Sequence, residues 1–145
     1  MSYVVTKRLG PFSACFRNWR AETHCKFLHG HDIEFTITLE ADELNEQGWV
    51  IDFGAFKPLR EKLNNTFDHK VIVADDDPHR DDITALAGLG VLDAVSMVSV
   101  GCEAFAAFAA VEMANILSDR GELGRVRVAS VWCYEQHNNA AGFEP

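Results

Sequence analysis

Two histidines that lie two residues apart, His29 and His31, are the first candidates for chemistry in this chain. Side chains at positions i and i+2 of a strand project from one face, so both imidazoles could reach the same metal ion. Cys25 lies four residues before His29, and a thiol beside a metal or a basic group such as Lys26 can act as a base or nucleophile. Each feature also has an inert interpretation, namely two histidines that end a strand by chance and a small buried thiol.

Two carboxylates and a histidine further along the chain add three more candidates. Asp68 directly precedes His69, and such a pair can hold an imidazole oriented as a general acid or base, although it also suits a plain helix end. Glu135 stands near the end of the last predicted strand. Its carboxylate can accept two parallel N–H bonds from the edge of a guanidine-like ring, whereas the alternative is an exposed strand end.

The strand that would position the two histidines is the clearest element of the sequence. Residues 29–41 alternate between apolar and polar side chains, which predicts a half-buried strand. Residues 3–9 and 12–16 favour two short extended stretches joined as a hairpin, because Gly10 and Pro11 between them turn or break a strand.

The other elements follow from apolar periodicity and turn residues. We expect a loop at 17–27, a turn at 42–48, a short strand at 49–51, a helix at 53–67, a short helix within 80–94, an extended piece at 95–100, a helix at 102–117 and a strand at 126–135. Asp52 is the expected helix cap, with Pro58 in the first turns. This order predicts an α+β two-layer domain, and its open sheet edges favour a homo-oligomer.

Composition and charge limit the classes of partner. The 145 residues suit a single domain over 1–145, and the net charge of −9 argues against nucleic acid and anionic membranes. Residues 1–31 nevertheless carry a net +4, so an anionic ligand would favour this part, unless it is simply a solvated basic edge. Four dispersed cysteines, with no apolar leader or membrane span, predict a cytoplasmic protein.

Taken together, these motifs resemble the 6-pyruvoyl-tetrahydropterin synthase family, which includes the bacterial 6-carboxy-tetrahydropterin synthase of the queuosine pathway. The resemblance covers nearly the whole chain. It rests on Phe12-Ser13-Ala14, Cys25-Lys26-Phe27-Leu28-His29-Gly30-His31, Gly48-Trp49-Val50-Ile51-Asp52-Phe53, Phe67-Asp68-His69, Gly101-Cys102-Glu103 and the late Glu135.

The resemblance implies a T-fold, in which a four-stranded antiparallel sheet carries two helices on one face and subunits assemble into a β-barrel as trimers or hexamers. It further implies that Cys25 is the catalytic thiol, that Asp68 and His69 act as an acid/base pair across a subunit boundary, and that Glu135 anchors a pterin. Glu103 would border the pterin pocket. The implied substrate is dihydroneopterin triphosphate.

The chain departs from the family pattern at the first zinc ligand. Phe16 stands where the family has a histidine, and Cys15 is one residue away, on the opposite face of a regular strand. His24 is therefore the expected replacement, and the predicted zinc ligands are His24, His29 and His31. Residues 74–100 are also longer than is usual for the family, and Gly101-Cys102 replaces its Pro-Thr.

The expected activity is that of a zinc-dependent 6-carboxy-tetrahydropterin synthase, a lyase that releases triphosphate and acetaldehyde from its substrate. The same core residues serve the 6-pyruvoyl product, so that alternative stays open, as does a related aldolase. A non-catalytic pterin-binding protein without zinc is a further alternative. Phe16 favours it, whereas Cys25, Asp68 and His69 argue against it because a binding protein needs none of the three.

Overall fold

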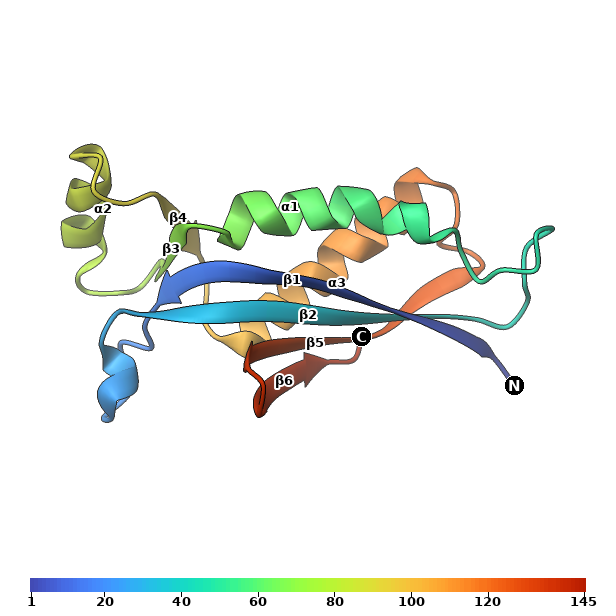
Figure 1. The fold of residues 1–145 in the computed structure, drawn as a ribbon, viewed down its shortest axis with the longest axis horizontal. Helices are drawn as coiled ribbons and strands as arrows, with labels where there is room; N and C mark the ends of the chain where they lie inside the picture. Colours follow the sequence, from blue (N-terminus) through green and yellow to red (C-terminus); the bar gives the residue numbers. More distant parts are fainter.

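Six strands form one mixed sheet in the order β4-β3-β1-β2-β5-β6 in the computed structural model, which describes all 145 residues (Figure 1). The strands are β1 (Tyr3–Phe16), β2 (His29–Ala41), β3 (Lys70–Ala74), β4 (Ala94–Met97), β5 (Val126–Gln136) and β6 (Asn139–Phe143). β1, β2, β5 and β6 pair antiparallel, while β3 and β4 add to the edge of β1 in parallel. The predicted sheet of four antiparallel strands is thus too small, because the short strands of the 70–97 segment extend it.

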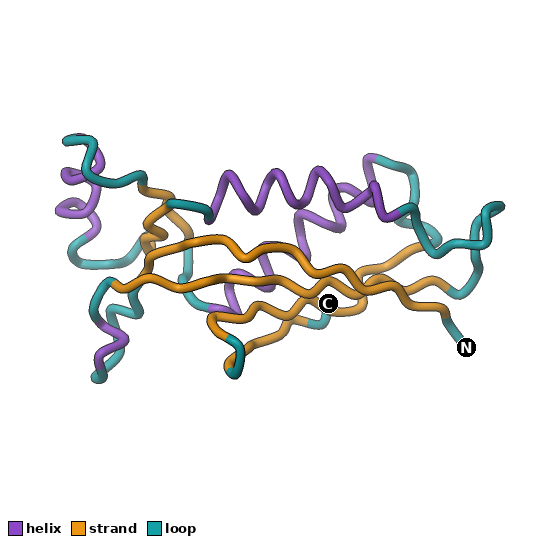
Figure 2. The backbone as a smooth tube through the Cα atoms, viewed as in Figure 1, coloured by secondary structure: helices purple, strands orange, loops and turns teal.

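Three α-helices and two short 3₁₀ helices complete the chain. They are η1 (His24–Lys26), η2 (Phe53–Phe56), α1 (Lys57–Phe67), α2 (Arg80–Gly88) and α3 (Cys102–Asp119). Figure 2 shows α1 and α3 over one face of the sheet, with α2 beyond its end. The predicted cap is confirmed, since Asp52 Oδ1 accepts a 2.7 Å bond from the backbone N–H of Gly54, and Pro58 lies in the first turn of α1. No helix combines the length and apolarity needed to cross a bilayer.

The core lies between the sheet and the two covering helices, and β2 supplies its centre. The alternation predicted for residues 29–41 is confirmed, because Ile33, Phe35, Ile37 and Leu39 are fully buried while the residues between them are not. The ring of Phe67 at the end of α1 packs 5.4 Å from that of Phe35. This packing fixes β2, so the two histidines at its start are held on the same face as the core.

β1 is one continuous strand, so the predicted hairpin at Gly10 and Pro11 is wrong. The register passes from Leu9 opposite Phe35 to Phe12 opposite Ile33, which is a bulge of two residues against one. Gly10 has φ +115°, and a Cβ there would lie 2.8 Å from the carbonyl oxygen of Ile33. The glycine therefore bends the strand and lets two backbones approach closely instead of reversing the chain.

The segment at 49–51 is likewise not the predicted strand. Trp49 has no regular structure, while Val50 and Ile51 form bends and bury their side chains in the core. The backbone N–H of Trp49 donates to Asn45 Oδ1 over 2.9 Å, and its carbonyl accepts from the N–H of Asn45. These local bonds replace a strand ladder, which is why the apolar run does not pair with β2.

Candidate active site

A cavity of about 880 Å³ lies where β1 ends, β2 begins and the start of α3 meets the end of β5. Six of the eight side chains predicted for the site line it, namely His24, Cys25, His29, His31, Glu103 and Glu135. They come from three regions far apart in sequence: residues 24–31, the start of α3 and the end of β5. Asp68 and His69 are not part of its lining.

The loop between β1 and β2, residues 17–28, carries His24 and Cys25. Thr23 caps η1, since its hydroxyl accepts a 3.4 Å bond from the N–H of Cys25. The carbonyl of Cys25 in turn accepts a 2.9 Å bond from the N–H of Asn18 on the other side of the loop. The side chains of His24 and Cys25 are exposed to solvent, so the thiol is open to a ligand that enters the cavity.

His29 and His31 lie side by side, with ring centroids 4.2 Å apart. Nδ1 of His29 lies 2.7 Å from the carbonyl oxygen of Phe27, and because a carbonyl only accepts, Nδ1 carries a proton, so that in the neutral ring Nε2 is the nitrogen with the free lone pair. Burial lowers the pKa of His31, and neighbouring His29 lowers it further. Both effects favour the uncharged form of the His31 ring.

Phe16 occupies the space beside His31. Its ring stacks on the imidazole at 4.1 Å with 15° between the planes, and meets the ring of Phe105 edge-on at 5.1 Å. Nδ1 of His31 is buried and has no hydrogen-bond partner. As expected, Cys15 faces the other side of β1, where partial burial raises the pKa of its thiol.

The predicted zinc ligands share the cavity but do not converge on one point. Catalytic zinc takes three protein ligands, and no three His, Cys, Asp or Glu side chains in the structure are placed to hold a metal ion. His29 and His31 are neighbours, His24 lies on η1, and the aromatic ring of Phe16 contributes no ligand atom. In this arrangement the side chains do not fit a three-ligand zinc site.

Glu135 and Glu103 supply the acidic wall of the cavity. Glu135 is half-buried near the end of β5, and its Oε1 accepts one long bond of 3.4 Å from Asn139 Nδ2. Most of its acceptor capacity is therefore free for a ligand. Glu103 lies in the first turn of α3. The preceding residue, Cys102, contacts Cys133 on β5, and this hydrogen bond together with burial raises the pKa of the Cys133 thiol. The contact between the two thiols holds the start of α3 next to the strand that carries Glu135.

Asp68 and His69 form a pair of their own at the end of α1. Asp68 Oδ1 accepts a 2.8 Å bond from the N–H of Ser13, and Oδ2 lies 2.8 Å from His69 Nδ1. The bond from Ser13, followed by that from His69, lowers the pKa of Asp68. His69 adopts a left-handed φ of 58°, and 84% of its side chain is exposed. The carboxylate thus orients an exposed imidazole that lies outside its own chain's cavity.

Ion pairs neutralise most of the basic N-terminal part. Arg8 pairs with Glu34 at 2.7 Å, Arg20 with Asp76 at 2.6 Å, and Arg17 makes bonds of 2.6 and 2.8 Å to Asp77. The acidic run at 75–77 by itself indicates an exposed turn, and sequence reasoning missed that two of its carboxylates bind arginines of the β1–β2 loop. The only signal in the sequence is the opposite charge of the two segments.

Comparison with known proteins identifies the family. The family model described as 6-pyruvoyl tetrahydropterin synthase matches residues 5–145. The chain belongs to the 6-pyruvoyl tetrahydropterin synthase family. Among curated relatives, the 6-carboxy-5,6,7,8-tetrahydropterin synthase of Aquifex aeolicus is 28% identical over 134 residues, which cover 90% of this chain and 82% of the relative.

Other curated relatives match this tetrahydropterin synthase family member over only about half of the chain. The 6-carboxy-5,6,7,8-tetrahydropterin synthase of Rickettsia typhi is 40% identical over 73 residues, 50% of this chain and 52% of the relative. The chain thus spans about half the length of the Rickettsia relatives it matches.

Solved structures share the fold of the tetrahydropterin synthase family over almost the full chain. An uncharacterized protein from Wolinella succinogenes matches with a TM-score of 0.85 at 21% identity, covering 99% of this chain and 98% of that one. The 6-pyruvoyl tetrahydropterin synthase of Plasmodium falciparum matches with a TM-score of 0.72 at 15% identity and the same coverage. At these identities the likeness concerns the fold alone.

Proposed function

We propose that this chain is a pterin lyase of the 6-carboxy-tetrahydropterin synthase type, acting on 7,8-dihydroneopterin triphosphate with loss of triphosphate and acetaldehyde. The observation that carries the proposal is that one cavity holds both a solvent-accessible thiol, Cys25, and a carboxylate with free acceptor capacity, Glu135. The names of the curated relatives, 6-carboxy-5,6,7,8-tetrahydropterin synthases, support this product class.

In the proposed reaction Glu135 and Cys25 divide binding from proton transfer. Glu135 accepts two N–H bonds from the amino and ring N–H groups of the pterin, which fixes the ring in one orientation. Cys25 moves a proton at the side chain of the substrate. His29 in its neutral form, with Nδ1 donating to the Phe27 carbonyl, can accept a hydrogen bond at Nε2 from a substrate hydroxyl in the same cavity.

Asp68 and His69 enter the proposal through a second copy of the chain. Their imidazole is oriented and exposed but lies outside its own cavity, so a neighbouring subunit would have to receive it. β6 and most of β1 leave sheet edges without a strand partner, and such edges favour self-association. We propose a homo-oligomer, a trimer or a hexamer, in which each cavity is completed by the neighbour's Asp68 and His69.

Zinc remains a prediction of the resemblance. His24, His29 and His31 would hold it if the loop at 17–28 moved His24 toward the other two, and a bound zinc ion would act as a Lewis acid on substrate oxygens. Because the side chains do not converge on one point here, no step of the proposed reaction depends on the metal.

A second candidate function rests on Phe16. The stacking of this ring on His31 fills a ligand position with an apolar group, which favours a pterin-binding homologue without lyase activity. Its cavity would hold the pterin through Glu135 but release no product. A 6-pyruvoyl-tetrahydropterin synthase would use the same residues and release triphosphate without acetaldehyde.

Product analysis distinguishes these functions. The purified protein is incubated with 7,8-dihydroneopterin triphosphate, and triphosphate, acetaldehyde and the mass of the pterin product are measured. The proposal predicts triphosphate and acetaldehyde in equal amounts. Triphosphate without acetaldehyde would assign the 6-pyruvoyl reaction instead. Bound but unchanged substrate, with or without added zinc, would favour the binding protein.

A further inference from the structure

The loop at 17–28 has little regular structure to hold it in place, although it carries Cys25. Its only helical turn is η1, which has three residues, and none of the residues 23–28 is buried. A thiol on such a loop would be poorly positioned for proton transfer unless another part of the chain restrains the loop.

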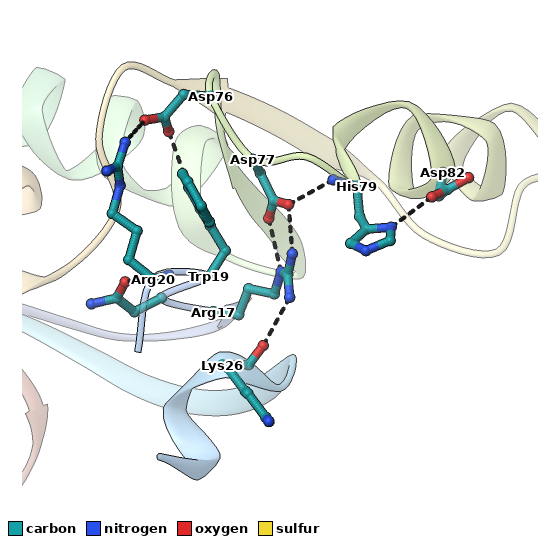
Figure 3. Close-up of polar contacts among 9 residues, drawn as sticks. Arg17, Trp19, Arg20, Lys26, Asp76, Asp77, His79 and Asp82 are labelled. Atoms are coloured by element: carbon teal, nitrogen blue, oxygen red, sulfur yellow. Dashed lines mark hydrogen bonds and ion pairs between the residues drawn. The ribbon is translucent and has the colours of Figure 1, made fainter. Parts of the chain in front are cut away.

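Arg17 provides that restraint at the start of the loop. Its Nε and Nη2 donate bonds of 2.8 and 2.6 Å to the two carboxylate oxygens of Asp77, and its Nη1 donates a 3.0 Å bond to the carbonyl oxygen of Lys26 (Figure 3). Lys26 directly follows Cys25. One guanidinium thus joins the start of the loop, the residue after the thiol, and the turn between β3 and α2.

Asp77 anchors the guanidinium from outside the cavity. It is the only buried charged residue of the chain, with 6% of its surface exposed, and Oδ1 also accepts a 2.9 Å bond from the N–H of His79. A buried carboxylate held by a bidentate guanidinium has a fixed geometry. Asp77 does not line the cavity, so it cannot contact a ligand bound there.

A neighbouring pair offers a matched comparison. Asp76, one residue earlier, accepts a 2.6 Å bond from Arg20 and a 3.1 Å bond from Trp19 Nε1, and so joins the same turn to the same loop. Its side chain is 54% exposed and that of Arg20 is 67% exposed. Exposed pairs contribute little, because water screens the charges and the side chains lose entropy.

We infer that Arg17 and Asp77 are positioning residues for Cys25, with the β3–α2 turn fixing the loop at 17–28 through Asp77, Arg17 and the carbonyl of Lys26. The inference rests on the proposed function for its effect on turnover. Asp77→Asn is expected to lower kcat on the order of 10²-fold, the cost of misplacing a reacting group by about 1 Å, and to leave KM nearly unchanged. Asp76→Asn should keep the wild-type kcat.

A double variant separates positioning from stability. Arg17→Met with Asp77→Leu replaces the ion pair by apolar side chains, an exchange that often preserves stability. It still removes the donor to the Lys26 carbonyl. Because Arg17 itself lines the cavity, KM is measured beside kcat. Positioning predicts that the melting temperature lowered in Asp77→Asn returns to the wild-type value, that kcat stays low and that KM stays near wild type. Recovery of kcat together with stability would overturn the inference and leave the pair a merely structural role.

Hydrogen exchange tests the same inference without any turnover. Asp77→Asn and the double variant should both exchange faster at the loop amides of residues 17–28, while β2 and α3 keep wild-type protection. Asp76→Asn should match wild type throughout. If the wild-type protein releases no product, the lyase proposal fails, but the exchange data still decide whether Arg17 and Asp77 restrain the loop. Unchanged loop exchange in Asp77→Asn would overturn the inference that they do.

Discussion

The phenyl ring of Phe16 lies flat on the imidazole of His31, with 4.1 Å between the ring centroids. Phe16 stands opposite His29 in the β1–β2 ladder, so its side chain projects to the same face as the two histidines. A histidine at this position would therefore place a third imidazole next to the other two. The apolar ring instead packs on His31 and on Phe105 of α3, and is itself part of the hydrophobic core.

Phe16→His should accordingly create a zinc site. Three imidazoles on neighbouring strand positions form the ligand set of a catalytic zinc site. We expect zinc affinity to rise by more than the roughly 10–100-fold that an outer-shell partner contributes. Elemental analysis and titration with a competing chelator measure it, with wild type and His24→Ala alongside. Equal zinc affinity in wild type and Phe16→His would contradict the interpretation that Phe16 occupies the place of a third zinc ligand.

Glu135→Gln should weaken pterin binding. The neutral amide loses the charge-assisted acceptor for one N–H and offers a donor where the ring also donates, which costs roughly 10–100-fold in affinity. Calorimetry or fluorescence titration with the pterin measures this loss. Glu144→Gln serves as the control, because Glu144 is exposed and does not line the cavity. Equal losses in the two variants would remove Glu135 from the binding site.

Mixed oligomers test whether Asp68 and His69 act on a neighbouring cavity. Cys25→Ala and His69→Ala should each be inactive, but refolding them together at equal amounts should restore about one quarter of wild-type activity, since a working site then needs one intact residue from each subunit. Chromatography of differently tagged chains verifies that the mixture forms. Mixed oligomers without activity would show that both residues serve the same chain's cavity.

The Arg17–Asp77 pair also predicts an acid-sensitive contribution to stability. The bonds from Arg17 lower the pKa of Asp77 below its ordinary value of about 3.9. The contribution is therefore complete above about pH 5 and is lost as pH falls through 4 toward the folded-state pKa. Breaking the pair in Asp77→Asn should cost roughly 3–5 kcal/mol at pH 7. Urea unfolding should show this gap closing below pH 4, and a gap independent of pH would contradict the assignment.

β2 and the shared face of the two histidines at its start can be predicted from the sequence, because a local pattern encodes them. Strict alternation fixes the faces of β2 and places His29 and His31 on one face at its start, whereas the position of Cys25 on the preceding loop does not follow from any periodicity. β3, β4 and β6 were harder because they have only four or five residues and their pairing depends on neighbours in the sheet.

Contacts between residues far apart in sequence account for the remaining differences between the predictions and the structure. Asp77 belongs to an acidic run that resembles an exposed turn, and only its contact with Arg17, 60 positions earlier, makes burial possible. The bulge in β1 depends on the backbone of Ile33 across the ladder, so Gly10 and Pro11 alone resembled a turn. The separation of Asp68 and His69 from the cavity likewise follows from packing and not from sequence spacing.

The most direct test of the account compares acetaldehyde release by wild type and Cys25→Ala at saturating 7,8-dihydroneopterin triphosphate, with Cys15→Ala as the matched cysteine control. Loss of a proton-transferring group should lower kcat by roughly 10²–10⁴-fold, while pterin binding stays at the wild-type level. Cys15→Ala should keep wild-type turnover, because Cys15 lies outside the cavity. Full acetaldehyde release by Cys25→Ala would contradict the proposed role of the cavity.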